Sequence, residues 1–176
     1  LEVFGQSGGY LVIGQTSLDF EVRPSASAQG GAFGARSVMG VDDATIHVNA
    51  DDVHSFNGTE DRSLGFDIQP AVRDLVSNIA STGLERVAVV HDRLRQIVRV
   101  AVPRVYPSTQ AGEWVLDLVR TRDQEGVPAW YRTDIAPNFY IYWDGNEPTA
   151  GNRGRLFFLP ASTNGHVFEL HNGQSL

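Results

Sequence analysis

The chain has 176 residues, a net charge of −7 and no cysteine, and all of its fourteen basic residues are arginine. Such an acidic chain is poorly suited to displace the counterions of nucleic acid, which argues against sequence-independent DNA binding. The lack of cysteine excludes disulfides, thiolate catalysis and thiolate metal sites. No stretch approaches the roughly 18 apolar residues of a membrane-spanning helix, so we expect no membrane span.

The first part of the chain predicts short strands joined by turns. Residues 1–23 contain one hairpin, and residues 24–34 are small, polar and glycine-rich, which indicates an exposed loop. Four strands follow, separated by aspartate, asparagine and glycine residues that favour turns. They are Arg36–Val41, Ala44–Asn49, Asp52–Phe56 and Arg62–Ile68. A meander of four strands in so few residues is typical of one β-propeller blade.

A single helix is predicted over residues 70–81. Val72, Leu75, Val76 and Ile79 recur at spacings of three and four, which is helical periodicity. Pro70 stands where the first turn of a helix tolerates proline. We therefore expect a short helix between two sheets.

Strands resume after this helix, with longer connections at 103–112, 121–127 and 144–154. The predicted strands are Glu85–Asp92, Arg95–Val102, Glu113–Arg120, Ala129–Asp134, Phe139–Trp143, Arg155–Leu159 and His166–His171. Short connections favour antiparallel pairing, and a lone helix among many strands argues against an α/β fold.

The predicted fold class is therefore all-β. We expect about thirteen strands in roughly three antiparallel meander sheets, forming one propeller-like domain over residues 1–176 with a helical insertion at 70–81. Known propellers have at least about four blades, so three do not close a ring. The propeller is accordingly expected to be incomplete, with further polypeptide or neighbouring subunits covering its end strands.

The order of these elements resembles structural proteins of tailed bacteriophages, especially the nozzle or tail-tube type with β-propeller repeats. The segment Asp52-Val-His-Ser-Phe-Asn-Gly-Thr59 is similar to the middle strand of their repeat, and Arg62-Ser-Leu64 to its last strand. A second, similar unit runs from Trp114–Leu118 through Ala129–Asp134 to Arg155–Phe158 and Gly165–Leu170. The likeness is one of pattern and covers most of residues 9–172.

This resemblance implies a structural component of a virion tail that assembles with copies of itself and with other virion proteins. It implies neither an enzyme nor a cofactor, and the family offers no catalytic residues. If such an assembly encloses a channel, acidic loops lining it would let DNA pass without specific binding.

The aromatic segment Phe139–Trp143 supplies the candidate contact residues. Strand alternation puts Phe139, Ile141 and Trp143 on one face, expected to be core, and Tyr140 and Tyr142 on the other. The tyrosine face is a candidate interface or ligand-stacking surface. The full candidate set is Tyr140, Tyr142, Trp143, Asp144 and Asn146. A carbohydrate-binding β-propeller module that holds sugars with the tyrosines is therefore an alternative function.

A glycosidase-like propeller enzyme is a second alternative. It requires two carboxylates about 5–10 Å apart, and Glu113 and Asp117, which flank Trp114, are the pair to test. No nucleophile elbow or phosphate-binding loop is present.

No metal site is predicted. The aspartate pairs 42–43 and 51–52 lack the spacing of a calcium-binding loop and fit turns better, and Asp144-Gly-Asn-Glu147 is expected to be a solvated loop. Five histidines occur, at positions 47, 54, 91, 166 and 171. His47 and His54 lie on adjacent predicted strands and can face each other, but strand histidines without a metal-binding signature are expected to be surface or half-buried spacers.

Overall fold

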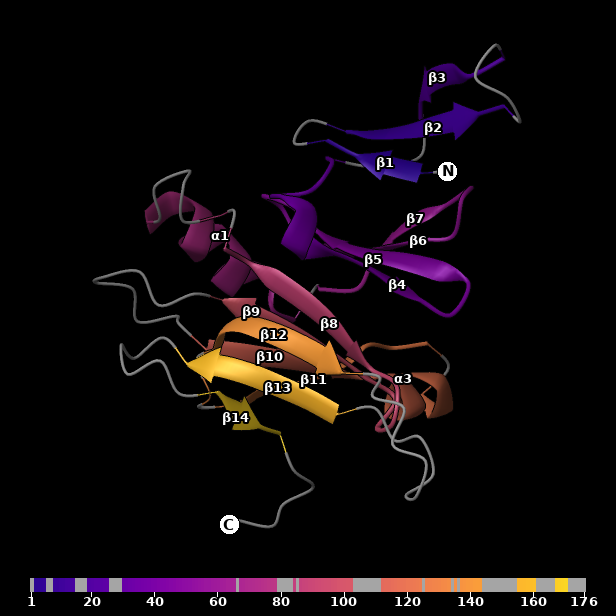
Figure 1. The fold of residues 1–176 in the computed structure, drawn as a ribbon. Helices are drawn as coiled ribbons and strands as arrows, with labels where there is room; N and C mark the ends of the chain where they lie inside the picture. Colours follow the sequence, from indigo (N-terminus) through magenta and orange to yellow (C-terminus); the bar gives the residue numbers. More distant parts are fainter. Residues whose placement is uncertain are drawn as a thin grey trace. The chain divides into compact units, whose positions relative to one another are not determined.

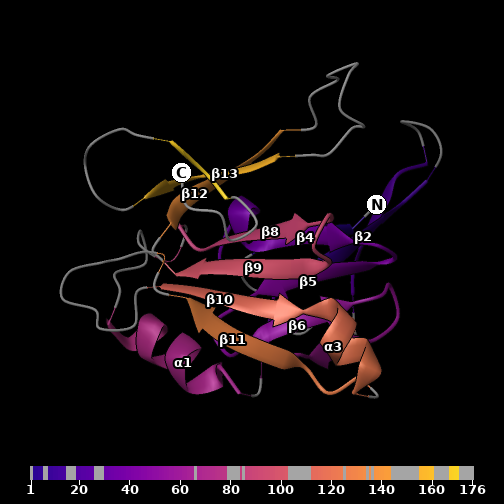
Figure 2. The same ribbon diagram turned by 90° about the horizontal axis from the view of Figure 1, so that it is seen from below.

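The computed structural model describes most of the chain in segments. The described residues are 2–5, 8–14, 19–25, 30–65, 67–78, 84, 86–102, 112–124, 126–133, 135, 137–143, 155–160 and 167–170. The chain divides into two compact units, residues 1–89 (unit 1) and 90–176 (unit 2), and the division falls within strand β8. Figures 1 and 2 show the elements of both units, coloured along the sequence.

Unit 1 contains two sheets and a helix. Sheet A has the order β1-β2-β3, and its strands are Glu2–Phe4, Gly9–Ile13 and Glu21–Pro24. Sheet B has the order β4-β5-β6-β7, and its strands are Val38–Val41, Ala44–Val48, Val53–Phe56 and Asp61–Ser63. A short 3-10 helix, Ala35–Ser37, precedes β4, and helix α1, Gln69–Asn78, follows β7.

The strands of unit 2 also form two sheets. Sheet C has the order β11-β10-β9-β8, with strands Ala129–Thr133, Gly112–Asp117, Ile97–Val102 and Ala88–Asp92. Sheet D has the order β12-β13-β14, with strands Pro137–Trp143, Arg155–Pro160 and Phe168–Glu169. Helix α3, Leu118–Asp123, connects β10 to β11 and contacts both strands (Figure 2).

The all-β class is confirmed, and the sheets are antiparallel. In every sheet each strand is bonded to the strand that precedes or follows it in the sequence, so all four sheets are meanders. The described residues form four sheets, where roughly three were predicted. At the N-terminus, where one hairpin was predicted, β1, β2 and β3 form a three-stranded sheet.

Helix α1 confirms the helical periodicity of its sequence. It begins at Gln69, so Pro70 lies in the first turn, where its missing N–H costs no hydrogen bond. Val72 is buried. The predicted strand Arg62–Ile68 is shorter than expected, because β7 ends at Ser63 and Ile68 already belongs to the turn that leads into the helix.

Residues 118–120 were predicted to continue a strand and are helical instead. The Asp117 carboxylate accepts a hydrogen bond from the Arg120 backbone N–H at 2.9 Å, which is the N-cap contact of α3. A capped first turn satisfies donors that a strand would have to pair elsewhere. The apolar alternation predicted a longer β10, but the strand ends at Asp117, whose side chain caps the helix that follows.

The loop predicted over residues 24–34 is not exposed along its length. Ala32 and Phe33 are buried. The Ala32 N–H donates to the Gly5 carbonyl at 2.8 Å, and the Phe33 N–H donates to the Val48 carbonyl at 3.0 Å. These two hydrogen bonds connect the segment to Gly5, which follows β1, and to Val48 of β5. The longer connections predicted at 103–112 and 144–154 lie outside the described residues, apart from Gly112 at the start of β10.

Candidate functional site

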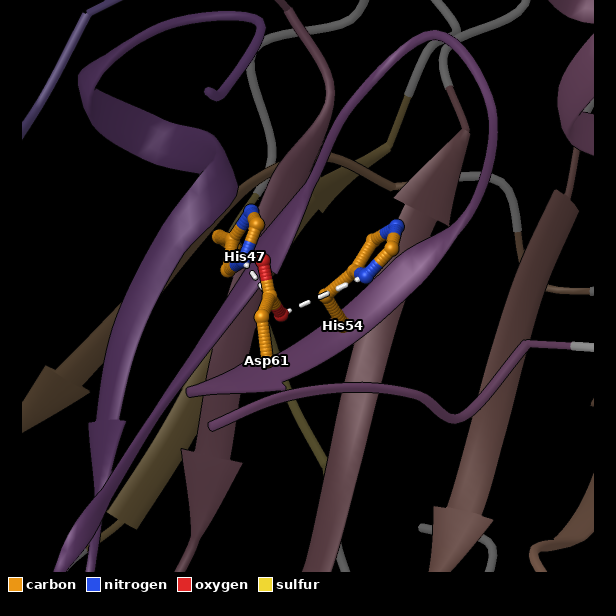
Figure 3. A group of neighbouring side chains, drawn as sticks. All are labelled: His47, His54 and Asp61. Atoms are coloured by element: carbon orange, nitrogen blue, oxygen red, sulfur yellow. Dashed lines mark hydrogen bonds and ion pairs between the residues drawn. The ribbon is translucent and has the colours of Figure 1, made fainter. Parts of the chain in front are cut away.

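Two histidines and an aspartate come together on one face of sheet B (Figure 3). His47 on β5 pairs directly with His54 on β6, and Asp61 on β7 pairs with Phe56, two residues from His54. Paired residues, and residues two apart, project to the same side of a sheet. The meander therefore places three polar side chains from three adjacent strands within reach of one another. We call His47, His54 and Asp61 the HHD cluster.

The HHD cluster is buried. His47 is 0% exposed, His54 is 6% exposed, and the Asp61 side chain is 0% exposed. His47 Nε2 lies 3.2 Å from Asp61 Oδ1, and His54 Nδ1 lies 3.3 Å from the same oxygen. One ligand atom from each residue lies within 4.8 Å of the other two, which makes this a group able to hold a metal ion.

The backbone sets the tautomer of His47. Its Nδ1 lies 2.8 Å from the Gly31 carbonyl oxygen, which can only accept a hydrogen bond, so Nδ1 carries a proton. In the neutral ring the lone pair is then on Nε2, the atom that faces Asp61. Burial, the largest influence, lowers the pKa of His47, while Asp61 and the Gly31 carbonyl act in the opposite direction.

The Gly31 carbonyl reaches His47 because Gly30 and Gly31 have positive φ angles of 73° and 69°. Residues with a side chain adopt positive φ angles only at an energetic cost, whereas glycine adopts them without it. At Gly30 a Cβ atom would also lie 2.5 Å from the Asn49 side-chain nitrogen. The glycine-rich composition that suggested an open loop therefore serves to turn the chain sharply beside the histidine.

His54 differs from His47 in its bonding. Within the described part of the chain neither of its ring nitrogens has a hydrogen-bond partner, although Nδ1 is at ion-pair distance from Asp61. The separation suits an ion pair, but the angle does not suit a hydrogen bond. A buried polar group without a partner costs about 1–3 kcal/mol, so this ring calls for an explanation.

Aromatic rings close the cluster on the side of sheet A. The Phe4 ring centroid lies 4.6 Å from that of His47 and 6.1 Å from that of Phe56. The two histidine rings are stacked, with centroids 5.1 Å apart and planes 16° from parallel. Apolar surroundings of this kind strengthen electrostatic interactions inside the cluster.

Sequence reasoning identified part of this cluster. It placed His47 and His54 on adjacent strands and recognised that they can face each other, but it predicted surface or half-buried spacers, and both rings are buried. It did not include Asp61. The signal was the turn at residues 57–60, where the Asn57 side chain accepts hydrogen bonds from the Thr59 and Glu60 N–H groups. This turn returns the chain with Asp61 opposite Phe56, on the same side of the sheet as His54.

The faces of β12 are the reverse of those expected. Alternation is observed, but Tyr140 is buried and Tyr142 half-buried, whereas Phe139 and Ile141 are 36% and 43% exposed. Tyr140 is therefore not available as a stacking surface. The backbone of Trp143 ends β12 and its side chain is outside the described structure. Asp144 and Asn146 lie outside the described residues.

Tyr140 instead completes a polar network between sheets C and D. Its hydroxyl donates to Glu113 Oε1 at 2.5 Å, and Arg99 Nη1 and Thr133 Oγ1 donate to Oε2 at 2.7 and 2.9 Å. Glu113 is fully buried. Burial, followed by the charge of Glu113, raises the pKa of Tyr140 well above its ordinary value. The carboxylate is satisfied by three donors, which indicates a structural role.

Glu113 and Asp117 do not form the pair that a glycosidase requires. They lie four positions apart on β10, which corresponds to roughly 13 Å along an extended strand. That spacing exceeds the separations of about 5–9.5 Å found for the two carboxylates of glycosidases. Asp117 is also engaged as the N-cap of α3.

The two three-stranded sheets carry apolar side chains on both faces. In sheet A the Phe4 side contacts sheet B, so the opposite side is the one with Val3, Tyr10, Val12 and Val22. In sheet D the Tyr140 side contacts sheet C, so the opposite side carries Phe139, Ile141, Phe157 and Leu159. We call these the A face and the D face.

No protein-family model matches this chain, and no curated protein sequence matches it significantly. In the described part of the chain, no helix has both the length and the apolar character needed to cross a membrane.

Proposed function

We propose that this chain is a structural module that works by assembling with copies of itself, as a component of a phage or phage-like tail. The observation that carries the proposal is the pair of apolar outward faces. Val3 and Val22 on the A face are 45% and 62% exposed. On the D face, Phe139 and Ile141 are exposed and Phe157 and Leu159 half-exposed. Exposed apolar side chains gathered on one face of a sheet are typical of interaction sites.

Two faces per chain suit a closed or extended assembly. A copy that offers one face to each of two neighbours makes heterologous contacts, which generate rings or open filaments. We propose that the A face of one copy contacts the D face of the next. The apolar faces supply the energy of association, since the net charge of −7 makes the copies repel one another.

The meander architecture supports the tail-component reading. Three or four antiparallel strands in sequence order make up each sheet, which is the form of a propeller blade. Together with the resemblance of residues 9–172 to nozzle and tail-tube proteins, this favours a rigid frame over a catalytic domain. Antibodies raised against the chain are expected to label the tail of the particles that contain it.

The test of assembly uses one charge on each face. Wild type is expected to form rings or tubes by negative-stain microscopy and concentration-dependent species in sedimentation velocity. Val22→Glu and Ile141→Glu are each expected to be monomeric, because each has lost one of the two complementary faces. An equimolar mixture of the two variants is expected to give a heterodimer, joined through the two intact faces.

Val127→Glu is the matched control. The exposed fraction of Val127 is 59%, similar to the 62% of Val22. Val127 lies between α3 and β11 and belongs to neither face. It should assemble like wild type, and circular dichroism should show all three variants folded. A wild-type chain that stays monomeric at high concentration, or a control that is impaired as strongly as Val22→Glu, would contradict the proposal.

A further inference from the structure

We propose that the HHD cluster binds one divalent transition-metal ion of the zinc class, which ties β5, β6 and β7 together. The ligands are His47 Nε2, His54 Nδ1 and a carboxylate oxygen of Asp61. This site goes beyond the assembly function, because none of its residues belongs to the A face or the D face.

The separations between the ligand atoms suit such an ion. Zinc binds nitrogen and oxygen at about 2.0–2.2 Å in tetrahedral geometry, which places neighbouring ligand atoms roughly 3.3–3.6 Å apart. The two histidine–aspartate separations are 3.2 and 3.3 Å. All three atoms lie within 4.8 Å of one another, and the side-chain torsion that turns a histidine ring is broad, so ring rotation can bring the nitrogens closer.

The bonding of His47 points to a cation in the same place. The Gly31 carbonyl accepts a hydrogen bond from Nδ1, so Nε2 is the ring nitrogen left to face the Asp61 oxygen, at 3.2 Å. Close approach of this nitrogen to a carboxylate oxygen needs a positive charge between them, which a proton or a bound metal ion supplies. A backbone carbonyl behind a histidine is also the arrangement that orients metal-ligating imidazoles and fixes their tautomer.

His54 supplies an independent observation. It is 6% exposed, and among the described residues neither of its ring nitrogens has a hydrogen-bond partner. Its Nδ1 nevertheless lies 3.3 Å from the same Asp61 oxygen. A metal ion at the cluster gives this nitrogen the partner that the described protein groups do not supply.

The donor set selects the class of metal. Imidazole nitrogens suit zinc, copper, iron and nickel, whereas calcium and magnesium prefer sites made of oxygen alone. Two histidines and one carboxylate with no thiolate therefore favour zinc and its neighbours. Three protein ligands leave one tetrahedral position for a water molecule. Because the ligands come from three adjacent strands and are buried, the ion acts as a cross-link within sheet B.

The experiment titrates chelator-treated full-length chain with cobalt(II), a spectroscopic substitute for zinc, and then with zinc. Wild type is expected to bind one ion per chain, with visible d–d bands that zinc abolishes, and zinc should raise its melting temperature. His54→Gln and Asp61→Asn keep the size of the side chain and are expected to lower affinity by at least about 100-fold, beyond the loss seen for outer-shell changes.

His91→Gln is the matched control, because His91 is also buried on a strand but lies outside the cluster. It is expected to bind one ion as wild type does. Histidine side-chain NMR of wild type gives a readout that needs no variant: zinc should shift two of the five imidazoles, and assignment should identify them as His47 and His54. This readout decides the question if the cluster variants fail to fold.

Three results would overturn the site. One is the absence of stoichiometric cobalt or zinc binding by wild type. Another is binding that persists in folded His54→Gln and Asp61→Asn. The third is a zinc-induced shift at histidines other than His47 and His54.

Discussion

Tyr140 and Glu113 form a hydrogen bond that joins sheets C and D of unit 2. The hydroxyl donates at 2.5 Å to a carboxylate that is fully buried. Hydrogen bonds to charged groups contribute about 1.5–3 kcal/mol, more than neutral ones. The contact therefore stabilises unit 2 and holds the tyrosine in its protonated form.

Tyr140→Phe is expected to lower the free energy of unfolding by about 1.5–3 kcal/mol at pH 7. The pKa of Tyr140 is raised in the folded state above the ordinary value of 10.0, so its contribution is fully present below pH 10 and is lost as the pH rises through the folded-state pKa. The difference between wild type and variant should therefore shrink above pH 10. Urea unfolding across pH 7–11 measures it.

Tyr142→Phe is the control for this measurement, since Tyr142 lies on the same face of β12 and is only half-buried. It is expected to change stability little at any pH. A difference between wild type and Tyr140→Phe that stays constant up to pH 11 would show that the Tyr140 hydroxyl does not couple to the fold in this way.

The sequence separated the two sides of β12 correctly but could not say which side is inward. Alternation depends only on the strand backbone, whereas the inward direction depends on Glu113, which lies 27 residues away and pairs with Tyr140. The sequence could predict that His47 and His54 face each other, because they lie on strands that follow one another and pair through a short turn. It could not predict which nitrogen of His47 carries the proton, because that depends on the Gly31 carbonyl.

At the scale of elements, α3 depends on its first residue. The Asp117 side chain caps this six-residue helix, which is too short to be stable by itself. The Leu118 N–H also donates to the Gln96 carbonyl, and the Thr121 hydroxyl donates to the Asp117 carbonyl. Asp117→Ala is expected to cost about 0.5–2 kcal/mol of stability, measured by urea unfolding followed by far-ultraviolet circular dichroism.

Asp123→Ala is the control in the same helix. Asp123 lies at the C-terminal end, where a negative charge interacts unfavourably with the helix dipole, so its removal should be neutral or slightly stabilising. Equal losses in the two variants would mean that the helix responds to charge in general and not to the cap.

Elements were predictable where the pattern was long or repeated. Helix α1 shows its period over ten residues, and the four strands of sheet B are separated by turn-forming residues. The end of β10 was missed because Leu118 and Val119 continue the apolar pattern, while the cap at Asp117 acts through a hydrogen bond.

At the scale of the whole molecule, charge and apolar faces act against each other. The net charge of −7 makes copies repel, and the A and D faces make them associate. Added salt screens the repulsion and leaves burial of apolar surface intact. Self-association is therefore expected to strengthen as the sodium chloride concentration rises from about 50 to about 500 mM, because the Debye length falls severalfold over this range.

Sedimentation velocity at fixed protein concentration checks this dependence. Val22→Glu should remain monomeric at both salt concentrations, because screening cannot restore an apolar contact that has been replaced by a carboxylate. Association that weakens with salt would instead indicate contacts dominated by ion pairs between copies.

The strictly sequential pairing of the strands bears on how the chain is made. In the four sheets of the described residues, each strand pairs with the strand next to it in the sequence, which leaves the ribosome directly before or after it. Local contacts of this kind form quickly. Each sheet is thus expected to form while the following one is still being translated, so the chain is expected to fold co-translationally, sheet by sheet.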